Sequence, residues 1–233
     1  DNSATALILT GGGARAAYQV GVLKAISEHF PKNSSNPFSI IVGTSAGAMN
    51  AATFAASANN FRLAVKKVER IWLNLHTDNV YIGSRRAAVQ NMLSLLGRLT
   101  GINQSSKQFT LLNNAPLADL IDKVVDFDSL QKRIDAGQLR SLAVTASKYA
   151  TGESIAFFQG HKDVQPWKHL RRHGEATQLT RQHLMASTAI PMLFPAVDIQ
   201  GEYYGDGALR QLAPLSTAIR MGGKPHCCNW SEW

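Results

Sequence analysis

The sequence of 233 residues contains little cysteine: Cys227 and Cys228 are its two cysteines, and they stand side by side near its end. Adjacent cysteines cannot connect distant segments, so no disulfide framework is expected and a reducing compartment is the simpler assumption. No run approaches the roughly 18 consecutive apolar residues of a membrane-spanning helix, and the N-terminus lacks the zones of a signal peptide. We therefore expect a soluble, cytoplasmic protein, with peripheral membrane association left open.

Other patterns that would indicate different classes of protein are also missing. The sequence has no internal repeat with a period of roughly 20 to 50 residues and no low-complexity tract, which excludes solenoids and disordered arrays. No loop combines the Asp, Asn and Gly ligands of a calcium site. We expect neither a metal nor another cofactor.

The charge is positive and unevenly placed. The formal net charge is +8, and residues 62–107 contain eight Lys/Arg and two Asp/Glu, which gives 8 − 2 = +6 in that segment. Because no nucleic-acid-binding motif accompanies these cations, we expect no nucleic-acid partner. An anionic membrane surface or a solvated face fits the segment better.

Strand, glycine turn and helix alternate along the chain. Apolar periodicity predicts strands at 5–10, 38–42, 141–147 and 154–158, a hairpin at 196–205, and helices at 14–30, 46–58, 61–76 and from Pro116 onward. Residues 166–174 carry several cations with little periodicity and are predicted to form a surface loop. The first strand–helix–strand unit favours an α/β fold with a mostly parallel central sheet covered by helices on both faces.

The motif Gly43-Thr44-Ser45-Ala46-Gly47 lies between a predicted strand and a predicted helix. Small residues on both sides of Ser45 permit the tight turn of a nucleophile elbow, from which the hydroxyl projects toward a substrate carbonyl. The alternative is a plain strand-to-helix turn in which Ser45 caps the helix.

A second glycine turn, Gly11-Gly12-Gly13-Ala14-Arg15, also follows an apolar strand and precedes a helix. Its backbone N–H groups can face a ligand closely, and the positive end of a helix favours the oxyanion of acyl transfer, which Arg15 would reinforce. The alternative is a nucleotide phosphate loop, but no Gly-Lys-Ser/Thr follows and the spacing differs from the dinucleotide fingerprint.

Asp206 stands in Gly205-Asp206-Gly207, directly after the predicted hairpin. An isolated Asp-Gly is usually a turn. A serine hydroxyl, however, needs a base, and a carboxylate within hydrogen-bond reach can serve directly. Asp206 is therefore the candidate base for Ser45.

These three motifs occur in the order in which the patatin-like phospholipase family has them, and the sequence resembles the bacterial type of that family. The segment Ala186-Ser187-Thr188-Ala189-Ile190-Pro191 is similar to the one that precedes the family's catalytic aspartate, and the resemblance extends from about Ala6 to Gly222. It implies a three-layer α/β/α sandwich and a single catalytic domain at 1–222.

The resemblance also implies a reaction. Ser45 would attack a lipid or other ester substrate and become acylated, Asp206 would act as the base of a Ser-Asp dyad, and amides around Gly12 and Gly13 would bind the oxyanion. Water activated by Asp206 would then release the fatty acid. No metal takes part.

Two other functions stay open. An α/β-hydrolase with a Ser-Asp-His triad needs a histidine after the acid, and only His226 follows Asp206. The other histidines are expected at the surface or at helix ends. Alternatively, the protein binds acyl lipids or regulators on the same fold without turnover.

Two segments depart from or extend this pattern. Residues 81–102 combine leucines with Arg85, Arg86 and Arg98, which fits either a lid or lipid-surface contact, or a helix packed on the core. Residues 223–233 form an atypical tail without the apolar strand expected of relatives.

Overall fold

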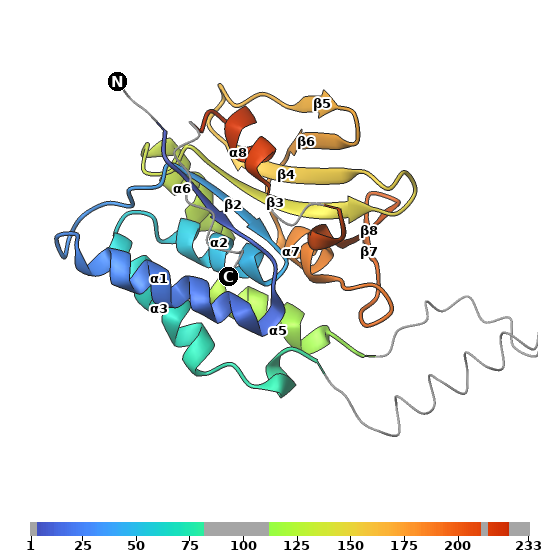
Figure 1. Ribbon diagram of the computed structural model, residues 1–233, viewed down its shortest axis with the longest axis horizontal. Coiled ribbons are helices and arrows are strands. Elements are labelled where there is room, and N and C mark those ends of the chain that lie inside the picture. Colours follow the sequence, from blue (N-terminus) through green and yellow to red (C-terminus); the bar gives the residue numbers. More distant parts are fainter. Residues whose placement is uncertain (1–3, 82–111, 211–213, 224–233) are drawn as a thin grey trace, which may run out of the picture.

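The computed structural model describes residues 4–81, 112–210 and 214–223 (Figure 1). The strands are β1 (Ala6–Leu9), β2 (Ile40–Thr44), β3 (Ser141–Lys148), β4 (Ser154–Gly160), β5 (Trp167–His169), β6 (Arg172–Ala176), β7 (Val197–Ile199) and β8 (Glu202–Asp206). The α-helices are α1 (Ala16–Glu28), α2 (Ala46–Ala56), α3 (Phe61–Leu73), α5 (Ala115–Val124), α6 (Phe127–Asp135), α7 (Arg181–Thr188) and α8 (Leu215–Arg220). Short 3-10 turns are η1 (Gly13–Arg15), η2 (Thr77–Asn79) and η3 (Gly207–Leu209).

The strands form one open sheet with the order β1-β2-β3-β4-β6-β5, and β8 pairs with both β3 and β7. The pairs β1–β2, β2–β3 and β4–β6 are parallel. The pairs β3–β4, β3–β8, β5–β6 and β7–β8 are antiparallel. The α/β class is confirmed, but the sheet is mixed rather than mostly parallel, because the hairpins in the second half of the chain pair strands that lead directly into each other.

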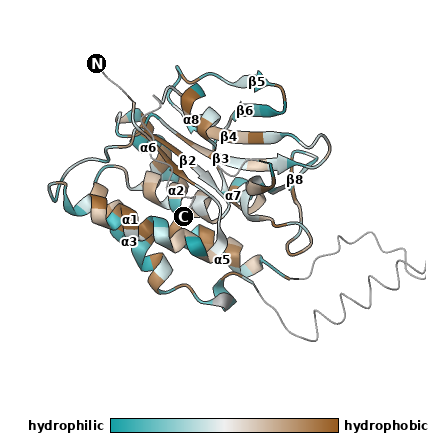
Figure 2. Cartoon of the chain, in the orientation of Figure 1, coloured by the Kyte–Doolittle hydropathy of each residue, from teal (hydrophilic) through white to brown (hydrophobic). Residues whose placement is uncertain are grey.

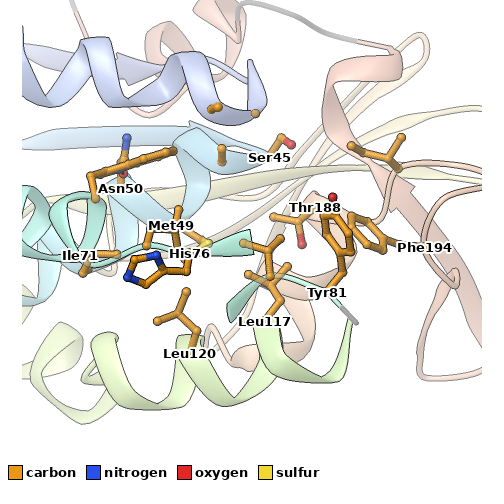
Figure 3. Close-up of a pocket in the computed structure, with 17 residues that line it drawn as sticks. Ser45, Met49, Asn50, Ile71, His76, Tyr81, Leu117, Leu120, Thr188 and Phe194 are labelled. Carbon is orange, nitrogen blue, oxygen red and sulfur yellow. The ribbon is translucent and has the colours of Figure 1, made fainter. Parts of the chain in front are cut away.

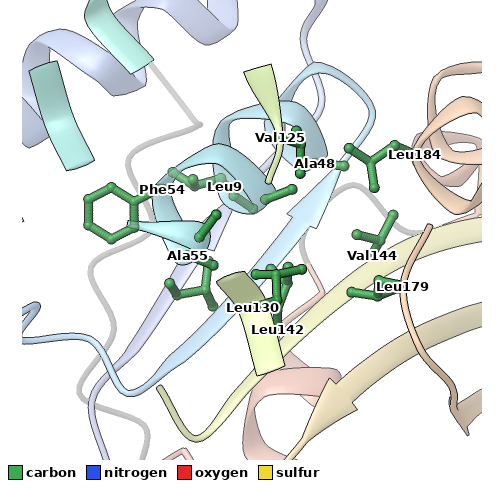
Figure 4. Packing of buried hydrophobic residues seen from close by; sticks show 14 of the residues in the cluster. Leu9, Ala48, Phe54, Ala55, Val125, Leu130, Leu142, Val144, Leu179 and Leu184 are labelled. Carbon is green, nitrogen blue, oxygen red and sulfur yellow. The ribbon is translucent and has the colours of Figure 1, made fainter. Parts of the chain in front are cut away.

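The larger part of the core lies between one face of the sheet and the helices α1, α2, α3, α5, α6 and α7 (Figure 4). Helix α3 shows why these segments fold as they do: Phe61, Ala64, Val65 and Val68 are buried at helical spacing, and its charged residues face outward. Helix α2 is buried along most of its length, which suits its alanine-rich sequence. This layer covers the face that carries Ile41.

The opposite face of the sheet has a smaller core. Ile40 and Val42, which alternate with Ile41 along β2, pack there with Ala218 and Met221 from the α8 region. Helix α8 is the helix that covers this face within the described residues (Figure 1). The sheet therefore lies between two layers of unequal extent.

Most predicted elements are present within a few residues of the predicted bounds. The surface loop predicted at 166–174 is wrong, because these residues form the hairpin of β5 and β6 at the edge of the sheet. Figure 2 shows this hairpin mainly in hydrophilic colours, so apolar periodicity could not have revealed it. Residues 82–102, expected to form either a lid or lipid-surface contact or a helix packed on the core, lie outside the described residues, as do the tail from residue 224 onward and His226.

No helix among the described residues is both long and apolar enough to cross a bilayer.

Candidate active site

Ser45 occupies a sharp turn between β2 and α2, with φ 54° and ψ −128°. Such a conformation costs a non-glycine residue on the order of 1–3 kcal/mol and persists only where the surroundings enforce it. Small neighbours are required here: a Cβ on Gly43 would lie 2.5 Å from Ala48 Cα, and one on Gly47 would lie 2.5 Å from the Thr10 carbonyl oxygen. The two glycines therefore let α2 approach the strands closely enough to form the elbow.

The pairing of β3 brings Asp206 to this elbow. Along one edge, β3 pairs first with β2, and Thr145 lies opposite Thr44. The next residue of β3, Ala146, pairs with Asp206 of β8 instead. Because Ser45 directly follows Thr44, the partner change on β3 places the serine and the aspartate side by side.

The side chains of Ser45 and Asp206 meet directly. Ser45 Oγ donates a hydrogen bond of 2.6 Å to Asp206 Oδ2, and the two residues are only 7% and 4% exposed. The other carboxylate oxygen, Oδ1, accepts the Ala208 N–H at 2.8 Å. Both oxygens have partners, and no histidine stands between the serine and the aspartate among the described residues.

Burial governs the protonation of Asp206. Desolvation raises the pKa of its carboxyl group, while the hydrogen bonds from Ser45 and from the Ala208 amide act in the opposite direction. A carboxylate with a raised pKa is a stronger base than one in water. The same burial therefore excludes solvent from the hydrogen bond and favours proton transfer from the hydroxyl.

The glycine turn after β1 lies beside the elbow, because β1 and β2 are parallel and Leu9 pairs with Gly43. Gly11 lies close to Ser45: a Cβ built on Gly11 would lie 3.3 Å from Ser45 Cβ. Gly13 adopts φ 55°, and the amides of Gly12 and Gly13 donate to no backbone acceptor among the described residues. Gly13 and Ser45 line the same cavity, which is where an oxyanion site is expected.

Arg15, predicted to reinforce the field of this turn, is exposed at the end of η1. It does not belong to the wall of the cavity described next.

A cavity of about 470 Å³ opens in front of Ser45 (Figure 3). Its wall is mainly apolar and comes from the glycine turn, α2, α3, α5 and the segment after α7. The lining residues are Gly13, Ala14, Ser45, Ala46, Met49, Asn50, Ile71, Trp72, Leu75, His76, Val80, Tyr81, Leu117, Leu120, Thr188, Ile190 and Phe194. Of this wall, Ser45 and Gly13 were predicted from the sequence as site residues; the other lining residues were not, because separate helices bring them together.

One polar chain crosses the cavity wall. Asn50 Oδ1 accepts the Trp72 Nε1–H at 2.7 Å, and Asn50 Nδ2 donates to Gln19 Oε1 at 3.2 Å. Gln19 Nε2 in turn donates to the Thr10 carbonyl at 2.8 Å. Because Thr10 precedes Gly11, the wall of the cavity is connected to the start of the glycine turn.

Histidines and metal ligands contribute little to this site. No group of three or more His, Cys, Asp or Glu side chains among the described residues could hold a metal ion. His183 is buried rather than at the surface, and it accepts the Thr180 N–H through Nδ1 in the first turn of α7. Its pKa is lowered by burial. His76 lines the cavity (Figure 3) but is exposed.

Comparison with known proteins identifies the family of this chain. A family model described as patatin-like phospholipase matches residues 7–219, so the chain belongs to the patatin-like phospholipase family. Membership supports lipid acyl hydrolase activity in general. No curated protein matches the chain.

A solved structure shares the fold. VipD from Legionella pneumophila is similar with a TM-score of 0.53 and 16% sequence identity. The match covers 90% of this chain and 46% of the VipD chain, so this chain spans less than half of that protein. At this identity the likeness concerns the fold alone.

Proposed function

We propose that the protein is a serine lipid acyl hydrolase that cleaves fatty-acyl esters through a dyad of Ser45 and Asp206 and an acyl-enzyme intermediate. The observation that carries this proposal is the buried 2.6 Å hydrogen bond between the two side chains at the wall of an apolar cavity. The hydroxyl faces substrate space while its proton points to a base.

In the first half of the reaction, Ser45 Oγ attacks the ester carbonyl and its proton passes to Asp206 Oδ2. The negative charge that develops on the carbonyl oxygen is stabilised by the amides of Gly12 and Gly13. Collapse of the tetrahedral intermediate breaks the ester bond, and the leaving alcohol or lysolipid takes the proton from Asp206.

In the second half, water replaces the alcohol. Asp206 accepts a proton from this water as it attacks the acyl-enzyme carbonyl, and the same amides stabilise the second oxyanion. Breaking the acyl–Oγ bond releases the fatty acid, and the proton returns to Ser45.

The apolar lining of the cavity favours a substrate with a long apolar acyl chain. Met49, Ile71 and Leu120 offer apolar surface in the cavity that Ser45 also lines, and burial of a fatty-acyl chain there is favourable by about 0.8 kcal/mol per CH₂ group. We propose phospholipids, lysophospholipids or neutral esters as substrates, which would make the enzyme a phospholipase A, a lysophospholipase or an esterase.

The test is an assay of released fatty acid across phospholipids, lysophospholipids and neutral glycerides, with wild type beside Ser45→Ala and Asp206→Asn. Both variants are expected to lose roughly 1,000-fold or more in kcat, because each removes a member of a unit that works together. Circular dichroism shows whether they remain folded. Activity retained in folded Ser45→Ala contradicts the proposal.

The two other functions predict different results. A lipid-binding protein without turnover would release no fatty acid and would react poorly with a fluorophosphonate probe. A Ser-Asp-His triad would lose activity in His226→Ala, whereas the dyad predicts a fully active variant.

A further inference from the structure

The segment that ends α7 contacts the backbone of both Ser45 and Asp206. Ser187 is fully buried, with 0% exposure, and its Oγ accepts a hydrogen bond of 2.8 Å from the Ser45 N–H. Two residues farther along, the Ala189 carbonyl accepts the Asp206 N–H at 2.9 Å. One short segment therefore holds the main chain on both sides of the hydrogen bond that joins serine and aspartate.

The backbone of Ser45 needs external support because its φ and ψ are sparsely populated. Its carbonyl accepts the Ala48 N–H at 2.8 Å, as the start of α2 requires. Its N–H has Ser187 Oγ as its acceptor. Without that hydroxyl, a buried donor would lose its partner and the turn would be less constrained.

Ser187 and the next residue, Thr188, make different contacts. Thr188 belongs to the cavity wall, and its hydroxyl donates to the Leu184 carbonyl of its own helix. Ser187 is not part of that wall. Its hydroxyl contacts the elbow instead and lies outside the space in which a substrate would bind.

The geometry points to Ser187 as a positioning residue, which orients Ser45 toward Asp206 by accepting the N–H of the nucleophile itself. The kinetic consequences of this inference rest on the proposed function. The structural consequence, a restrained Ser45 amide, does not.

The kinetic test compares Ser187→Ala with Ser187→Cys. Ser187→Ala is expected to lower kcat about 10- to 100-fold, because a small displacement of a nucleophile slows the chemical step, with KM changed by less than about twofold. Ser187→Cys is expected to lie between wild type and alanine, because sulfur is a weak acceptor.

Ser27→Ala is the matched control. It also deletes a buried serine hydroxyl, but among the described residues that hydroxyl hydrogen-bonds only within α1, to the Lys24 carbonyl at 2.8 Å. Its kcat is expected to stay within about twofold of wild type. If Ser187→Ala loses no more activity than Ser27→Ala, the inference is overturned.

A second measurement does not depend on turnover. Amide hydrogen exchange followed by NMR is expected to show the Ser45 amide exchanging at least about tenfold faster in Ser187→Ala than in wild type, with the amides of β2 unchanged. Unchanged protection of the Ser45 amide would overturn the inference. Should the wild type hydrolyse no ester, the proposed function fails, and the exchange rates still decide the role of Ser187.

Discussion

Asp206 must carry a negative charge to act as the proposed base, but its buried position disfavours that charge. Burial raises the pKa of this carboxyl above its ordinary value of 3.8. A carboxyl whose pKa is higher in the folded than in the unfolded chain stabilises the fold when protonated. That contribution is complete below pH 3.8 and is lost as pH rises through the folded-state pKa. Catalysis by the proposed dyad would have the opposite dependence, because its base must be ionised.

We therefore expect Asp206→Asn to be inactive yet more stable than wild type at neutral pH. Asparagine removes the buried charge while Oδ1 can still accept the Ala208 N–H and Nδ2 can donate to Ser45 Oγ. Thermal unfolding should show a higher Tm for the variant, by about 2–4 °C for each kcal/mol of desolvation relieved. The difference in Tm between the variant and wild type should disappear below pH 3.8. In wild type, kcat/KM should rise through an apparent pKa above 3.8. A variant that melts below wild type at neutral pH contradicts this account.

Gly43 tests the packing that forms the elbow. Gly43→Ala would place a Cβ 2.5 Å from Ala48 Cα and 2.6 Å from Ala51 Cβ, atoms that cannot move without shifting α2. We expect a loss of about 1–3 kcal/mol in the free energy of unfolding, measured by urea denaturation. The matched control is Gly21→Ala on α1, where a Cβ meets no described residue within 4 Å outside its own helix and helix propensity predicts a gain of up to about 1 kcal/mol. Equal stability of the two variants would show that the elbow tolerates a side chain.

At the scale of elements, α5 is expected to limit the acyl chain that the cavity accepts. Leu120 of α5 lines the cavity, so Leu120→Trp should reduce its volume. We expect kcat/KM for a palmitoyl ester to fall at least about tenfold relative to a butyryl ester, because lost chain burial weakens binding in the transition state. Asp119→Trp, which adds the same bulk at an exposed position of α5, should leave the ratio unchanged. An unchanged ratio in Leu120→Trp would place the acyl chain elsewhere.

The local parts of the fold were predictable from the sequence, because a short apolar run bounded by glycine carries its own signal. Strands β1 and β2, helix α2 and the turn at Ser45 were predicted in this way. The β5–β6 hairpin was missed because its residues are largely polar. Helix α7 was missed because its sequence, Arg-Gln-His-Leu-Met-Ala-Ser-Thr, has little amphipathic periodicity.

The assembly of the site was only partly accessible to sequence reasoning. Ser45 and Asp206 could be named as a pair, but their meeting depends on the change of partner along β3 from β2 to β8. Such pairing joins residues far apart in the sequence and has no local signal. The contact between Ser187 and Ser45 likewise depends on where α7 docks. The sequence offered Ser187 only as part of a motif, and the catalytic roles of these residues stay predictions.

At the scale of the whole molecule, the two faces of the sheet differ in their helical cover, and the proposed site lies on the more heavily covered side. The proposed nucleophile and glycine turn follow the carboxyl ends of β1 and β2, the side of a parallel sheet at which ligands usually bind. The cavity lies on the helical side, between α2, α3 and α5. A lipid substrate would therefore arrive from the side of the molecule that α3 borders, and that helix carries exposed cations such as Lys66 and Arg70.

The net charge of +8 and this placement predict attachment to anionic membranes through the α3 side. The double variant Lys66→Glu/Arg70→Glu lowers the net charge by 4, and at about 1 kcal/mol for each cation near the surface it should weaken binding to phosphatidylserine vesicles roughly 30-fold. Its control, Lys162→Glu/Lys168→Glu, changes the charge equally at two exposed residues, one just after β4 and one within β5. These strands lie far from α3 in Figure 1. Sedimentation with anionic and neutral vesicles, at low and high salt, measures both. If the two double variants lose binding to anionic vesicles equally, only the net charge of the protein matters. If wild type binds neutral and anionic vesicles equally, electrostatic attraction does not contribute to binding, and high salt should not weaken it.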